Sequence, residues 1–97
     1  MLSRSSAKQW LAEQCELESA LQEAFLFGSF IKSSDTSADV DMMCIFNVRN
    51  VRVWSSQTKS HFLKKFGIPL HLQRFHKNDV EEIAKFLDVA KTWEKIV

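Results

Sequence analysis

The motif Gly28-Ser29, separated by nine residues from Asp39-Val40-Asp41, constrains this chain more than any other feature. Residues 24–27 before the glycine form a continuous apolar run, and residues 42–46 after the second aspartate form another. Runs of this length are typical of strands buried on both faces of a sheet. The segment 32–37 between them is small and polar, which predicts a loop. The pattern therefore brings the polar ends of two strands to one edge of a sheet.

The rest of the chain supplies helices for this sheet. Apolar residues at helical spacing predict helices, and alternation of apolar and polar residues predicts a third strand. The start of the middle helix is open, because Val51–Trp54 fits a strand extension equally well. The expected elements are a helix over 6–22, strands over 24–27 and 39–46, a helix over 51–66, a strand over 68–75 and a helix over 79–95. This order, α-β-β-α-β-α, predicts an α/β fold with a small mixed β-sheet flanked by helices.

Size and composition narrow the class of protein. A chain of 97 residues supports one core, so we expect a single domain over residues 1–97. Its net charge of +1 gives no indication of nucleic acid as a partner. No apolar run approaches the ~20 residues of a membrane helix, and residues 1–6 lack the apolar segment of a signal peptide. Cys15 and Cys44 lie in apolar settings without CxxC spacing, so we expect reduced, buried thiols and a cytoplasmic protein.

The aspartate pair carries the chemistry. Asp39 and Asp41 are two residues apart on an expected strand, so both side chains project from the same face. Adjacent carboxylates repel each other and are costly to bury, which favours a bound cation between them. Oxygen ligands suit Mg²⁺ or Mn²⁺, and such ions stabilise the charge that develops in phosphoryl or nucleotidyl transfer. By itself such a pair is frequently only a solvated strand end.

The Gly-Ser pair fits a phosphate. Gly28 allows the backbone to approach a phosphate closely, and the hydroxyl of Ser29 and nearby N–H groups can donate to phosphate oxygens. A helix that starts at Phe30 would add a favourable dipole, and Lys32 a further positive charge. A Gly-Ser after a strand is usually just a turn. Together with the paired aspartates, in this order, it favours a Mg–triphosphate site.

Residues 26–41 resemble the active-site motif of the DNA polymerase beta nucleotidyltransferase superfamily. The length of the chain resembles the minimal nucleotidyltransferase (MNT) proteins of prokaryotes. The family pattern commonly has an arginine three positions after the serine and a second serine before the first aspartate. Here Lys32 and Ala38 occupy those positions. The order of elements is similar to the family core over nearly the whole chain.

The resemblance implies a nucleotidyltransferase fold and a function. ATP or another NTP would be the substrate, and a nucleoside monophosphate would pass to an acceptor hydroxyl. Gly28 and Ser29 would hold the triphosphate, with Lys32 beside them, and Asp39 and Asp41 would bind the Mg²⁺ or Mn²⁺ ions. Proteins of the MNT type often pair with a HEPN-type toxin, on which they act as antitoxins, so the resemblance also implies a protein partner.

One departure from the family pattern bears on catalysis. The family has a third carboxylate on the next core strand, and the expected strand over 68–75 has no acid. His71 and Gln73 occupy the face where the acid is expected. His71 can ligate a metal or accept a proton, given its near-neutral reference pKa, or it can be an ordinary hydrogen-bonded histidine. The loop acids Asp35 and Asp79 are further candidates that the spacing does not require.

Three functions remain open on the sequence. The first is an enzyme that transfers AMP from ATP to a hydroxyl acceptor, such as a partner HEPN toxin. The second is a catalytically weak or inactive nucleotidyltransferase-fold protein that binds a nucleotide or docks to a partner as an antitoxin. The third is a small α/β interaction domain with an accidental motif. The missing acid favours the second function, while the retained Gly-Ser and aspartate pair favour the first.

Overall fold

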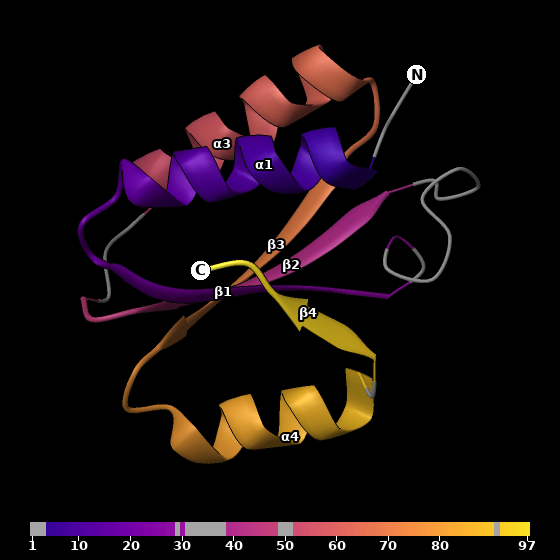
Figure 1. Ribbon diagram of the computed structural model, residues 1–97. Helices are drawn as coiled ribbons and strands as arrows, with labels where there is room; N and C mark the ends of the chain where they lie inside the picture. Colours follow the sequence, from indigo (N-terminus) through magenta and orange to yellow (C-terminus); the bar gives the residue numbers. More distant parts are fainter. Residues whose placement is uncertain (1–3, 29, 31–38, 49–51, 91) are drawn as a thin grey trace.

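A computed structural model describes residues 4–28, 30, 39–48, 52–90 and 92–97. Helices α1 and α3 lie on one face of the β-sheet, and α4 lies on the other (Figure 1). The elements are α1 (Arg4–Glu16), β1 (Leu21–Phe27), β2 (Val40–Phe46), α3 (Arg52–Phe66), β3 (Leu70–His76), α4 (Val80–Ala90) and β4 (Trp93–Lys95). The expected α/β fold with a mixed sheet between helices is confirmed.

The sheet has the strand order β3-β2-β1-β4. Strand β2 is central: it pairs antiparallel with β1 and parallel with β3, while β4 pairs antiparallel with the other side of β1. The long connection through α3 allows the parallel pairing, which a tight hairpin cannot provide. The two strands that flank the Gly-Ser and aspartate motifs are therefore neighbours, as the sequence predicts.

Alternating side chains of the strands divide the core into two clusters. The larger cluster lies between the sheet and the pair α1 and α3, and the smaller one lies under α4. Fully buried members of the larger cluster include Leu11, Leu26, Phe30, Met42, Phe46 and Phe62. The smaller cluster consists of Phe25, Met43 and Ile45, with partly buried aromatic and aliphatic side chains of α4 packed on it. Burial on both faces explains the continuous apolar runs of β1 and β2.

The first helix ends six residues earlier than the sequence predicts. It stops at Glu16, and β1 begins at Leu21 instead of at residue 24. Leu17 and Leu21 have helical spacing, but Leu17 is 77% exposed while Leu21 is buried in the sheet. The N–H groups of residues 17 and 18 donate hydrogen bonds to the carbonyls of residues 14 and 15, three positions back, and the helix ends there. Pairing of Leu21 with Phe46 then fixes the start of the strand, and such pairing overrides local periodicity.

The last helix is also shorter than predicted. It ends at Ala90 rather than at residue 95, and Trp93–Lys95 form an edge strand that the sequence pattern did not reveal. Three residues are too few for periodicity to show. The strand exists because it pairs with β1 over Phe25–Phe27. The other three elements agree closely with the prediction. Strand β2 starts one residue later than expected, α3 confirms the middle helix with residues 52–54 helical rather than a strand extension, and β3 is shifted by one to two residues.

Both cysteines are free and buried, as expected. Burial raises the pKa of the Cys15 thiol to about 12, and Glu16 contributes in the same direction. Burial likewise raises the pKa of Cys44 well above its ordinary value. Both thiols are therefore protonated at neutral pH and serve as small apolar side chains.

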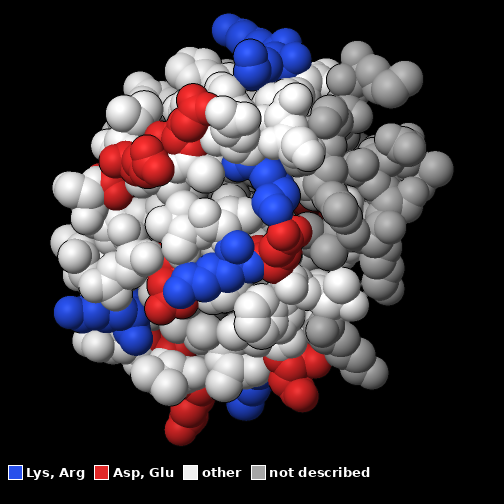
Figure 2. Space-filling view, in the orientation of Figure 1, with Lys and Arg blue, Asp and Glu red and all other residues white. Residues whose placement is uncertain are grey.

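One face of the molecule has mixed charge: Figure 2 shows acidic and basic side chains interspersed on the face in view. Among the described helices, none combines the length and the apolar character that crossing a membrane requires.

Replacing Trp54 by phenylalanine should lower the free energy of unfolding by about 1–2 kcal/mol. The indole Nε1 donates to the Gln14 carbonyl at 3.1 Å and thereby ties α3 to the end of α1. The phenyl ring keeps an aromatic contact with Phe46 but removes this donor. Urea unfolding monitored by circular dichroism measures the change. An unchanged midpoint would show that the tie contributes nothing.

Candidate active site

Asp39 and Asp41 lie at the start of β2, on the face of the sheet that α4 covers farther along the strand. Val40 between them points to the opposite face and is fully buried, which holds the two carboxylates on one side. The Asp39 side chain is 33% exposed and that of Asp41 28%. Both carboxylates are thus partly shielded yet reachable from solvent, as a ligand site requires.

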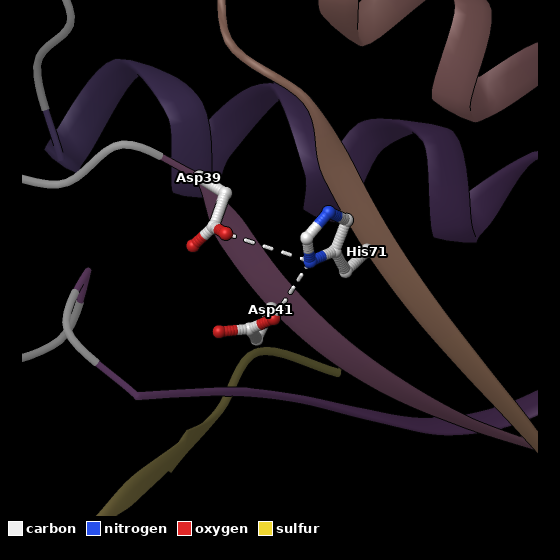
Figure 3. A group of neighbouring side chains, drawn as sticks. All are labelled: Asp39, Asp41 and His71. Atoms are coloured by element: carbon white, nitrogen blue, oxygen red, sulfur yellow. Dashed lines mark ion pairs between the residues drawn. The ribbon is translucent and has the colours of Figure 1, made fainter.

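His71 joins this pair from the neighbouring strand. The parallel register places His71 directly opposite Asp41. Its Nδ1 lies 3.3 Å from Asp41 Oδ1 and 3.5 Å from Asp39 Oδ2, so one ring nitrogen faces both carboxylates (Figure 3). The position at which the sequence lacked the expected acid is therefore part of the site.

The electrostatics of the site are dominated by crowding of negative charge. Partial burial raises the pKa of Asp41, and the neighbouring Asp39 raises it further. The imidazole of His71 opposes both effects without cancelling them. Asp41 is accordingly the carboxylate whose ionised form most needs a positive partner.

Gly28, which directly follows β1, lies beside the Asp41 carboxylate. It adopts a positive φ of 81°, a conformation that favours glycine. A Cβ atom at this position would lie 2.9 Å from Asp41 Oδ2, closer than real Cβ atoms approach. The absence of a side chain at Gly28 therefore leaves the space that the Asp41 carboxylate occupies.

A row of residues crosses the sheet at the level of the site. Phe27 pairs with Asp41 on one side and with Trp93 on the other, so His71, Asp41, Phe27 and Trp93 lie in register on four strands. Trp93 is 43% exposed and packs edge-on against Phe25. No local sequence pattern connects Trp93 with the site, because only the pairing of β4 with β1 brings it there.

The structure places some expected site residues and not others. Ser29 and Lys32, expected to bind the triphosphate, lie outside the described residues, as does the loop acid Asp35. Asp79 lies beyond the other end of β3, where its carboxylate accepts a hydrogen bond from the His76 N–H at 2.9 Å. Asp79 therefore does not supply the third acid.

The donors that do converge fit a divalent cation. One oxygen of each aspartate and the imidazole nitrogen of His71 all lie within 4.8 Å of one another. Carboxylate oxygen and imidazole nitrogen are both common ligands of divalent metals. Of the residues described, Asp39, Asp41 and His71 are thus those that would hold the ion that the resemblance of the sequence motif implies.

Comparison with known proteins supports the fold. No family model matches the sequence, and no curated protein does. The chain matches a solved structure described as tri-AMPylated Shewanella oneidensis HEPN toxin in complex with MNT antitoxin, with a TM-score of 0.67 and 10% identity over 98% of this chain and 72% of the matched chain. A second Shewanella oneidensis crystal structure matches with a TM-score of 0.66, 9% identity and the same coverage.

At 10% and 9% identity these matches show the fold alone, which is nucleotidyltransferase-like. This is the fold that the Gly28-Ser29 motif and the aspartate pair imply by resemblance.

Proposed function

We propose that this protein is a nucleotidyltransferase that transfers AMP from ATP to a hydroxyl group of a partner protein of the HEPN toxin type. The observation that carries the proposal is the convergence of Asp39, Asp41 and His71 beside Gly28 on this fold. A purely structural domain has little use for two crowded carboxylates at a solvent-accessible strand end, because they repel each other.

In the proposed reaction, some site residues hold the cation and others contact the triphosphate. Asp39 and Asp41 hold the divalent cation, which when bound neutralises phosphate charge during transfer. Gly28, directly after β1, leaves room for the carboxylate of Asp41. The acceptor hydroxyl loses its proton to water and its oxygen forms a bond to the α-phosphorus, while the bond from that phosphorus to the bridging β-phosphate oxygen breaks and pyrophosphate leaves. Ser29 and Lys32 are proposed to contact the triphosphate.

The nature of the acceptor is supported by the structural match. That structure is described as holding a tri-AMPylated HEPN toxin and an MNT antitoxin in one complex. This chain is therefore similar in fold to one chain of a complex in which the toxin is AMPylated. A partner protein also suits a small domain with an open site, since the partner can supply both the acceptor and part of the wall around it.

A second candidate function is antitoxin action by docking alone. The observation that favours it is the absence of a carboxylate on β3, whose sequence is Leu-His-Leu-Gln-Arg-Phe-His. In this alternative the fold binds a HEPN-type partner, with or without a nucleotide, and transfers nothing.

A labelling experiment separates the two functions. The protein is incubated with ATP labelled at the α-phosphate, with Mg²⁺ or Mn²⁺, and with a HEPN-type protein encoded beside it. The proposal expects label on the partner, and the double variant Asp39→Ala plus Asp41→Ala should move none. If no label moves while the two proteins still co-purify, transfer is excluded and docking is left as the function.

A further inference from the structure

His71 faces the aspartate pair from the neighbouring strand β3. Its Nδ1 is directed at both carboxylates, at 3.3 and 3.5 Å, from a strand whose register with β2 fixes this approach. Leu70 and Leu72, on either side of it, belong to the core on the opposite face. The backbone is thus held by its neighbours, and His71 is presented to the aspartates.

These distances are longer than those of a closed ion pair. A charged N–H donor lies about 2.7–2.9 Å from a carboxylate oxygen when the two form a strong hydrogen bond. Ligands that are neighbours around one six-coordinate ion, with bonds of about 2.1 Å, lie about 3 Å apart. The separations at Nδ1 are close to the second value, and the nitrogen favours neither aspartate strongly. All three donor atoms lie within 4.8 Å of one another, which is close enough for them to share one ion.

A nitrogen donor changes which metal the site prefers. Mg²⁺ is a hard ion that selects oxygen ligands and gives up water reluctantly. First-row transition ions accept imidazole nitrogen readily and bind a given nitrogen and oxygen set with increasing affinity from Mn²⁺ onward. Exchanging a carboxylate for an imidazole also removes one negative charge, which weakens the purely electrostatic attraction on which Mg²⁺ binding depends.

We propose that His71 is a metal ligand through Nδ1 and that it makes the Asp39–Asp41–His71 site selective for Mn²⁺ over Mg²⁺. This inference rests on the proposed function for the presence of a divalent cation. It goes beyond that function in naming the third ligand and the preferred class of metal.

Binding of Mn²⁺ to the purified full chain tests the inference without any transfer reaction. Electron paramagnetic resonance gives the free Mn²⁺ concentration, and competition with Mg²⁺ gives the ratio of the two affinities. Pulsed measurements on the bound ion detect the magnetic coupling of a directly bonded ¹⁴N nucleus. We expect this coupling in the wild-type protein. Its absence, or a failure of Mn²⁺ to bind, would overturn the inference.

Three variants assign the coupling to a residue. His71→Gln should remove the ¹⁴N coupling and weaken Mn²⁺ binding about tenfold, since metal sites lose roughly 10–100-fold in affinity even when only a supporting group is removed. His71→Asp should also lose the coupling and shift the preference toward Mg²⁺. His61→Gln is the matched control, because His61 is an exposed residue of α3. Unchanged Mn²⁺ affinity in His71→Gln would contradict the assignment.

The binding result and the labelling result are independent. If Mn²⁺ binds without a nitrogen ligand and label still moves to the partner, the inference about His71 fails and the proposed function stands. If the nitrogen coupling is present and no label moves, the metal site stands and nucleotidyl transfer fails.

Discussion

Replacing Asp41 by asparagine should strongly reduce the proposed nucleotidyl transfer while leaving the fold at least as stable as the wild-type protein. The amide is nearly the same size but cannot neutralise a cation, so we expect transfer to fall by about 10³-fold, equivalent to about 4 kcal/mol of transition-state stabilisation. The expectation that the variant is at least as stable follows from the environment of the Asp41 carboxylate. Partial burial, and then the charge of Asp39, raise the pKa of Asp41, so its ionised form is disfavoured in the folded protein.

The sign of the pH dependence can be worked out from this shift. A pKa that is higher in the folded state means that the folded protein binds the proton more tightly. The contribution of Asp41 to stability is therefore fully present below the pKa of the unfolded chain and is lost as the pH rises through the folded-state pKa. At neutral pH the wild-type protein carries the cost of an ionised Asp41 and the asparagine variant does not. The stability advantage of the variant should shrink as the solution is acidified.

Denaturant unfolding of both proteins, without added metal, at neutral pH and at a pH below the usual range of carboxylates measures this effect. Asp88→Asn makes the same chemical change at an exposed position of α4 and should alter neither transfer nor stability appreciably. A variant at Asp41 that unfolds more readily than the wild-type protein at neutral pH would contradict the electrostatic argument. Retained transfer would contradict the assignment of Asp41 to the active site.

Replacing Gly28 by alanine should both destabilise the protein and impair transfer. Gly28 has φ of 81°, and a non-glycine residue in this region costs about 1–2 kcal/mol. In addition, the new methyl group would lie 2.9 Å from Asp41 Oδ2, so the carboxylate must move. A displacement of this kind at a reacting site costs about 10²-fold in rate.

Gly67 offers a matched control for the contact between the new methyl group and Asp41. It follows α3 with φ of 77°, and no atom lies within 4 Å of the position that its Cβ would take. Gly67→Ala should therefore lose a similar amount of stability and keep full transfer activity. Thermal unfolding and the labelling assay, applied to both variants, separate backbone strain from the contact with Asp41. Equal loss of transfer in the two variants would show that the contact is irrelevant.

Much of the fold could be predicted because its central strands carry strong local signals. The apolar runs that become β1 and β2 are buried on both faces. The two strands pair with each other, so the strands that flank the Gly-Ser and aspartate motifs are neighbours in the sheet, as expected. The errors lie where tertiary pairing decides. Leu17 continues a helical pattern yet is exposed. Trp93 was expected within the last helix yet lies in β4, because pairing with β1 stabilises a strand too short to be recognised locally.

In the site, too, local patterns could be predicted from the sequence and strand pairing could not. Alternation along a strand correctly places Asp39 and Asp41 on one face, and the same rule put His71 on the face where an acid was expected. What the sequence could not provide is the register between β2 and β3, which brings His71 opposite Asp41 and sets one nitrogen between two carboxylates. The contact of Gly28 with Asp41 also depends on pairing, in this case between β1 and β2.

The alternation of β3 has a consequence for how such a site can evolve. Leu70 and Leu72 anchor the strand in the core, whereas the His71 side chain is 55% exposed and contributes little to packing. The residue proposed as the third ligand is thus separate from the residues that maintain the fold. A single codon change at position 71 can exchange imidazole for carboxylate without repacking the interior. If the proposed ligand role of His71 holds, selection can adjust the metal preference of this scaffold while the architecture stays constant.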